Sequence, residues 1–162
     1  MYTVFLILHI ICSGCWISIL FANISVGGVL KKSVGTLGEL YLMRALIAVG
    51  SVMGNIGGIG ILITGSVITG MDHKGWFPFG TLNWLACKQV IFIVLLGMTF
   101  GVMVPRVKKA RRMIAEELAG ASPTKGASVA LRKLIMGIMP IGMVMNVLVL
   151  LNIILGTWKP NF

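Results

Sequence analysis

Two ionisable residues, His9 and Lys88, lie in apolar stretches and are the side chains of this chain best suited to functional chemistry. Residues 1–30 contain no Asp, Glu, Lys or Arg, and Lys88 follows Trp84 by four positions at the start of another apolar run. Ionisable side chains are costly in hydrocarbon and therefore mark functional sites. A neutral imidazole in a helical bundle is a natural axial ligand for haem iron. The alternatives for His9 are a hydrogen-bonded packing histidine and a group that handles a metal or protons.

Three further residues bear on that choice. His73 is the only other histidine, so a bis-histidine site within one chain would have to recruit it from a polar loop. Cys12 and Cys15 form a CxxC motif, which suggests redox or metal chemistry in a soluble fold. Inside an apolar helix we favour the simpler interpretation of small interface residues. The apolar runs contain no carboxylate, so a proton or cation relay lacks its usual parts.

Four charge-poor runs, residues 4–30, 45–71, 84–104 and 134–158, must position these side chains. Each is long enough to cross a bilayer, which takes about 20 apolar residues. Only 11% of the residues are charged, against about 25% in soluble domains, and the mean hydropathy is +1.00. The apolar runs are continuous rather than alternating, which favours helices over a barrel. We therefore expect an all-α polytopic membrane protein, a four-transmembrane-helix bundle forming a single domain over residues 1–162.

The basic residues predict the orientation of the bundle. Three of the fourteen Lys and Arg residues lie between the first two runs, and eight lie between the last two. The positive-inside rule then places both connections in the cytoplasm and both termini on the outer, periplasmic side. The third helix is expected to continue into the cytoplasm to about residue 119, as a basic surface for anionic lipid or a partner, or only as a topology signal. Topology also explains the net charge of +10, and nucleic acid is not expected as a partner.

The second run is rich in glycine, and Gly50, Gly54 and Gly58 form GxxxG pairs that allow close helix packing. One face of it is expected to pack against the polar face of the first helix. The face of the second helix consists of Ser51, Asn55, Gly58, Leu62 and Ser66, and that of the first consists of His9, Cys12, Ser13, Trp16, Asn23 and Gly27.

This topology places His9 and Lys88 at a similar depth, roughly 6 to 8 Å below the outer boundary. Lys88 can then snorkel outward beside Trp84, or turn inward to neutralise a haem propionate. The candidate cofactor-binding residues are His9, Trp16, Lys88, Trp84 and His73, with His9 as the metal ligand.

Three motifs resemble a bacterial four-helix membrane superfamily. They are LHIICSGCWISILF at 8–21, GILITGSVITG at 60–70 and TLNWLACKQVIFIVLLG at 81–97. The superfamily includes the HemJ-type protoporphyrinogen oxidases, the CopD-type proteins and a related family of predicted integral membrane proteins. The resemblance implies a haem b site that uses His9, with Lys88 nearby. The Leu-Pro-Arg-Leu run of the HemJ pattern is replaced by Ile-Leu-Phe-Ala at 19–22, so haem binding is favoured over porphyrinogen oxidation.

The sequence thus predicts a multi-pass protein of the bacterial cytoplasmic membrane that binds haem b near the outer side. Its role would be electron transfer or haem-related redox chemistry, with a haem-linked oxidoreductase as one possibility. The alternative is a non-catalytic accessory subunit of a larger respiratory or photosynthetic complex. The expected partners are the lipid bilayer and either other membrane-protein subunits or further copies of the chain.

Overall fold

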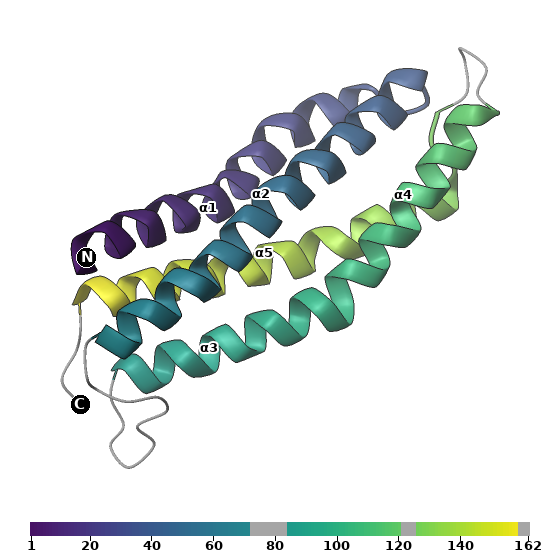
Figure 1. Ribbon diagram of the computed structural model, residues 1–162. Helices are drawn as coiled ribbons and strands as arrows, with labels where there is room; N and C mark the ends of the chain where they lie inside the picture. Colours follow the sequence, from purple (N-terminus) through teal and green to yellow (C-terminus); the bar gives the residue numbers. More distant parts are fainter. Residues whose placement is uncertain (72–83, 121–125, 159–162) are drawn as a thin grey trace.

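The computed structural model describes residues 1–71, 84–120 and 126–158, and in these residues the chain is almost entirely helical (Figure 1). Four helical rods are long and apolar enough to cross a membrane. This confirms the predicted all-α bundle of four helices. The rods are α1 (Tyr2–Lys32), α2 (Leu37–Met71), the continuous rod of α3 (Trp84–Met98), the π-helix η1 (Thr99–Met103) and α4 (Val104–Ala119), and α5 (Val129–Trp158).

Two helices begin well before the apolar runs that predicted them. α2 starts at Leu37 rather than residue 45, and α5 starts at Val129 rather than residue 134. Hydropathy reports only the part of a helix that lies in hydrocarbon, whereas helical hydrogen bonding continues into charged residues. A local signal marks the start of α5, because the Ser128 hydroxyl accepts the Leu131 N–H at 3.1 Å as an N-cap.

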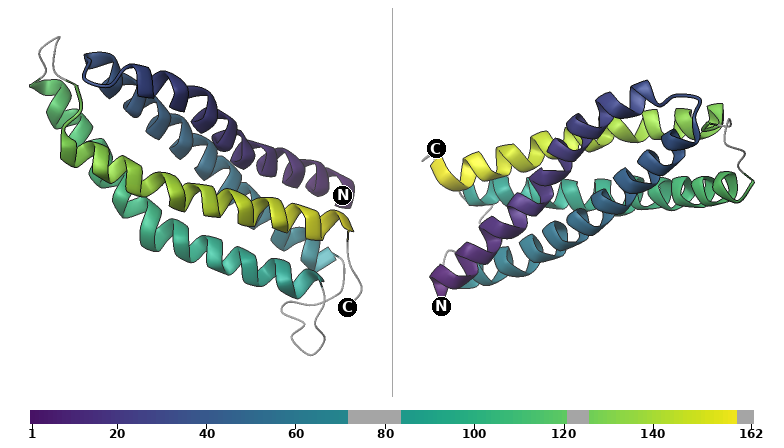
Figure 2. Two further views of the ribbon diagram at one scale, coloured as in Figure 1. Left: turned by 180° about the vertical axis from the view of Figure 1, so that it is seen from behind. Right: turned by 90° about the horizontal axis from the view of Figure 1, so that it is seen from above.

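The helices form two pairs, α1 with α2 and the α3–α4 rod with α5 (Figures 1 and 2). α1 packs along α2, α3 packs along α5, and α1 also contacts α5. α4 contacts both α2 and α5. Within the described residues, no Cα atom of α2 lies within 8 Å of one in α3 or α5. Along most of its length α2 therefore approaches only α1 closely, and at the basic end its side chains also contact α4 and α5.

We name the two ends of the bundle by what lies there. The start of α1 and the end of α5 lie together at the terminal end (Figure 1). The opposite, basic end contains the α1–α2 turn, α4 and the start of α5. His9 and Lys88 belong to the terminal half, and the cationic segments belong to the basic end.

The curve between α3 and α4 lets one rod contact two different neighbours (Figure 1). It coincides with the π-helix η1, which is followed by Pro105 in the first turn of α4. Proline has no N–H to donate, and its ring clashes with the carbonyl four residues earlier, so a regular α-helix cannot continue unchanged. A π-turn is one way to absorb that defect and bend the rod. As a result α3 follows α5 while α4 reaches α2.

Two apolar clusters fill the interior. The cluster in the middle of the bundle joins α1, α3 and α5, and the cluster at the basic end joins α2, α4 and α5. The middle cluster contains Trp16, Leu95, Met145 and Val149, and the basic-end cluster contains Leu40, Met43, Ala110, Ile114, Ala127, Leu131 and Ile135.

A buried carboxylate closes the basic end. Glu39, in the first turn of α2, is only 1% exposed. Its carboxylate accepts a bidentate pair of hydrogen bonds at 2.7 Å from Nε and one terminal nitrogen of Arg132 in α5. It also accepts the backbone N–H groups of Gly35 at 2.9 Å and Ala127 at 3.1 Å. A single side chain thus ties the α1–α2 turn to the start of α5, and a bidentate geometry is the stronger kind of ion pair.

Two glycines make that closure possible. A Cβ on Gly126 would lie 2.5 Å from the Cα of Gly35 and 2.8 Å from Oε2 of Glu39. Gly35 itself has φ of 85°, a left-handed conformation that favours glycine. The turn and the segment before α5 therefore approach each other at a point where neither has a side chain.

We expect Glu39→Gln to destabilise the bundle by about 1–3 kcal/mol, because two backbone donors and a guanidinium lose their charged acceptor. The control is Glu116→Gln, the same substitution in the Arg112–Glu116 pair, whose side chains are 82% and 59% exposed. Thermal unfolding in detergent measures both. A lower midpoint only for Glu39→Gln is predicted, and equal midpoints would show that the buried pair contributes little.

Candidate functional site

The site is built on a glycine seam between α1 and α2. We use this name for Gly57, Gly58, Gly60 and Gly65 of α2 and the α1 residues that pack on them. A Cβ on Gly57 would lie 3.0 Å from both the Cys12 carbonyl oxygen and the Trp16 Cβ, and one on Gly60 would overlap the Cys12 sulfur. Because the backbones approach this closely, α1 side chains reach directly across α2.

The prediction that glycines let these helices approach is supported by this seam, but of the predicted face of α2 only Gly58 belongs to it. Asn55 and Leu62 are exposed, and Asn55 lies about 180° around the helix from buried Thr64. Gly50 and Gly54 meet only Ile19, at ordinary contact distances of 3.9 and 3.7 Å. Both polar and small residues suit helix interfaces in lipid. Here α1 packs on the glycines of α2, because they leave room for Trp16 and Cys12.

His9 is held by a hydrogen bond across the seam. Its Nδ1 lies 2.8 Å from the Thr64 hydroxyl oxygen, and Thr64 is 6% exposed. The Thr64 hydroxyl donates its own proton to the Gly60 carbonyl at 2.6 Å. Nδ1 must therefore carry the hydrogen and donate it, which leaves the lone pair on Nε2. In the described residues no hydrogen bond is made to Nε2.

The lack of a side chain on Gly65 gives the imidazole its room. A Cβ there would lie 3.3 Å from Cε1 of His9. Thr64 thus supplies the hydrogen-bond acceptor, and Gly65 leaves the space that the ring occupies. These two contacts fix the ring orientation and the tautomer.

Lys88 approaches the same region from α3. Its ammonium lies against α5, where a Cβ on Gly156 would be only 2.6 Å from Nζ. Asn152 of α5 donates to the Lys88 carbonyl at 3.1 Å, and Nζ is 5.8 Å from the Trp84 ring centroid. His9 and Lys88 both lie in the terminal half of the bundle, and no Cα atom of α1 lies within 8 Å of one in α3 in the described residues.

The other candidate residues are less closely associated with the imidazole. Trp16 lies two helical turns along α1, is 8% exposed and packs in the middle apolar cluster. Trp84 stands at the start of α3 beside Lys88. His73 lies outside the described residues. Trp84 therefore lies beside Lys88, and Trp16 is a packing residue of the middle apolar cluster.

The donor set fits a single-imidazole ligand and not a multi-ligand metal centre. Among the described residues no three His, Cys, Asp or Glu side chains converge. The three cysteines are free thiols, and Cys12 packs into the glycine seam. This packing agrees with the interpretation of the CxxC motif as small interface residues.

Three residues of this region were not singled out from sequence, namely Thr64, Asn152 and Gly156. Thr64 lies within the GILITGSVITG motif, so the signal available was a hydroxyl near the depth of His9 in a neighbouring span. Asn152 and Gly156 are spaced by four on α5 and share a face. Only the packing of α5 on α3 shows that this face receives Lys88.

No protein-family model, curated protein or solved structure matches this chain. The fold and site therefore define it by class only: an all-α bundle of four helices apolar enough to cross a membrane, with an oriented histidine and a lysine in its terminal half.

Thr64→Val should change the tautomer of His9, because it removes the oxygen that accepts the Nδ1 proton. Side-chain ¹⁵N NMR on a His73→Gln background, above the pKa of imidazole, distinguishes a protonated from a bare ring nitrogen. We expect protonated Nδ1 in the parent and a mixture of tautomers in Thr64→Val. Thr69→Val is the matched control, since the Thr69 hydroxyl also bonds its own helix, at the Gly65 carbonyl. A parent with protonated Nε2 would contradict the assignment.

Proposed function

We propose that this chain binds haem b in its terminal half, with His9 as an axial ligand, and serves electron transfer or haem-related redox chemistry. The hydrogen bond from His9 Nδ1 to Thr64 carries this proposal. Metal-binding histidines nearly always donate their second ring N–H to an acceptor, which fixes the tautomer and increases the basicity of the ligating nitrogen. When bound, the haem would supply a one-electron couple at iron.

Lys88 supplies the second requirement of a haem site, a cation for a propionate. A lysine in hydrocarbon needs compensation, and a charge-assisted hydrogen bond to a carboxylate provides it. In the proposed site the Lys88 ammonium, at the start of α3, would donate such a bond to a haem propionate.

The proposed setting is the bacterial cytoplasmic membrane, with the basic end in the cytoplasm. The concentration of Lys and Arg in the two connections at that end supports this orientation. His9 and Lys88 then lie toward the periplasmic side. An electron partner would approach the terminal end from that side.

Haem binding is tested by the reduced-minus-oxidised absorption spectrum of protein purified from cells with ample haem. We expect b-type bands that His9→Ala removes and that His73→Ala leaves in place. Lys88→Met should weaken retention about tenfold or more through loss of one charge-assisted hydrogen bond, while Lys88→Arg keeps most of the haem. A parent protein without haem bands contradicts the proposal. If both Lys88 variants retain full haem, Lys88 is not a propionate partner.

A second candidate function is that of an accessory subunit that associates with other membrane helices, and Asn55 favours it. Asn55 lies mid-span on α2, exposed and opposite the glycine seam, and no hydrogen bond to its side chain is present within the described residues. Val52, Ile56 and Ile59 around it are also exposed. An amide in hydrocarbon gains most from another helix that offers a donor and an acceptor, such as the same Asn of a second copy.

Asn55→Val should therefore shift the protein toward monomer, while Asn55→Gln preserves association because it keeps the amide. Light scattering during size-exclusion chromatography in a mild detergent reports the mass, and cross-linking in membranes checks it. The expected loss is modest, about 0.6–2 kcal/mol per interhelical hydrogen bond. A parent protein that is monomeric in both experiments would argue against this interface.

A further inference from the structure

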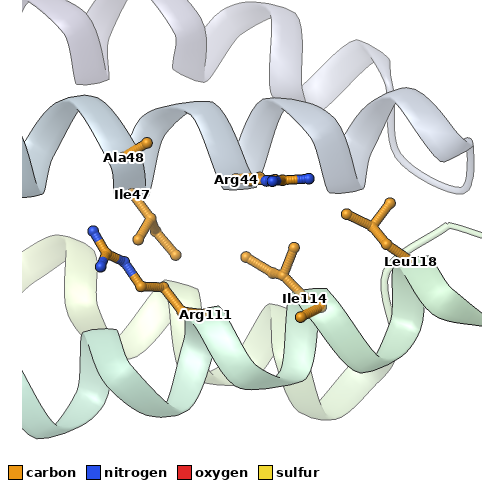
Figure 3. A pocket seen from close by; sticks show the side chains of 7 residues that line it. Arg44, Ile47, Ala48, Arg111, Ile114 and Leu118 are labelled. Carbon is orange, nitrogen blue, oxygen red and sulfur yellow. The ribbon is translucent and has the colours of Figure 1, made fainter.

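A groove with two arginines opens between α2 and α4 at the basic end (Figure 3). Its volume is about 440 Å³. Arg44 of α2 and Arg111 of α4 line it, and Ile47, Ile114 and Leu118 contribute apolar walls. Arg111 rises from α4 toward Ile47, and the Arg44 guanidinium lies above Ile114 (Figure 3). The groove therefore combines cationic donors with an apolar floor.

Neither arginine has an acidic partner in the described residues, and the carboxylates near them are engaged elsewhere. Glu39 holds Arg132, Glu116 pairs with Arg112, and Glu117 accepts two hydrogen bonds from Ser128. The fourth acidic residue of the chain, Asp72, follows the terminal end of α2. The positive charge of the groove is thus left for an anion from outside the chain.

The walls select an amphiphile over a small anion. Ile47 and Ala48 begin the apolar run of α2, and exposed Val52 and Ile56 continue from Ala48 at a spacing of four along the helix. A free phosphate would leave these walls bare. The groove also lies where the apolar run meets the cationic α4, which is the level of lipid headgroups in a membrane.

We propose that this groove binds an anionic phospholipid, with the phosphodiester accepting hydrogen bonds from Arg44 and Arg111 and an acyl chain along Ala48, Val52 and Ile56. Guanidinium groups present planar sets of N–H donors that match phosphate oxygens. Lipid bound here would bridge α2 and α4 beside the Glu39 closure. The site is separate from the proposed haem site and does not depend on it.

The test uses delipidated full-length protein in detergent, titrated with phosphatidylglycerol or phosphatidylcholine and followed by native mass spectrometry. We expect phosphatidylglycerol to bind about tenfold or more tightly than phosphatidylcholine, and Arg44→Gln/Arg111→Gln to remove most of that difference. The control Arg106→Gln/Lys109→Gln removes the same charge from exposed α4 positions outside the groove lining and should bind as the parent does.

Three results would overturn the site. Equal binding of the two lipids would show that no anion is recognised. An equal loss in the control variant would show that only the net charge matters. Competition by soluble glycerol 3-phosphate as strong as that by the lipid would show that the apolar walls contribute nothing. Both groove arginines are exposed, so circular dichroism and the unfolding midpoint should remain unchanged and confirm that the variants are folded.

Discussion

The structure depends on one constraint, that hydrocarbon offers no water to satisfy a polar group. Most hydroxyls in the spans meet it locally, because Ser13, Ser18 and Thr69 donate to carbonyls of their own helix. Polar contacts that cross between helices are few in the described residues, and they lie toward the two ends of the bundle. Between them, glycine and apolar packing hold the helices together. The cross-helix contacts therefore mark the positions where polar side chains of different helices pair with one another.

These contacts serve different purposes at the two ends. At the basic end, Glu39 and Arg132 satisfy each other and two backbone donors, so the cluster is self-contained and structural. At the terminal end, the bond between His9 and Thr64 satisfies only one nitrogen of the imidazole. Lys88, at the start of α3, lies in the same half of the bundle. The first arrangement stabilises the bundle, whereas the second leaves the Nε2 lone pair of His9 without a hydrogen bond in the described residues.

The number of spans was predictable because hydropathy reports directly how much chain can lie in hydrocarbon. The prediction that His9 and Lys88 lie at a similar depth was derived from the same spans. The partner of Glu39 did not follow, since Arg132 is 93 positions away and no local pattern links them. The packing face of α2 was also missed, because glycines lie on several of its faces and only α1 side chains such as Trp16 decide which one is used. The roles of Thr64 and Gly156 likewise depend on helix packing, since Thr64 contacts His9 of α1 and Gly156 contacts Lys88 of α3.

A density map of the purified protein, by electron cryo-microscopy or crystallography, tests the ligand role of His9 most directly. The protein should come from cells supplied with haem. The predicted result is planar non-protein density joined to Nε2, with Thr64 still bonded to Nδ1 and the Lys88 ammonium beside the propionate edge. An imidazole whose Nε2 contacts only protein or water would contradict the proposal and make His9 a packing residue.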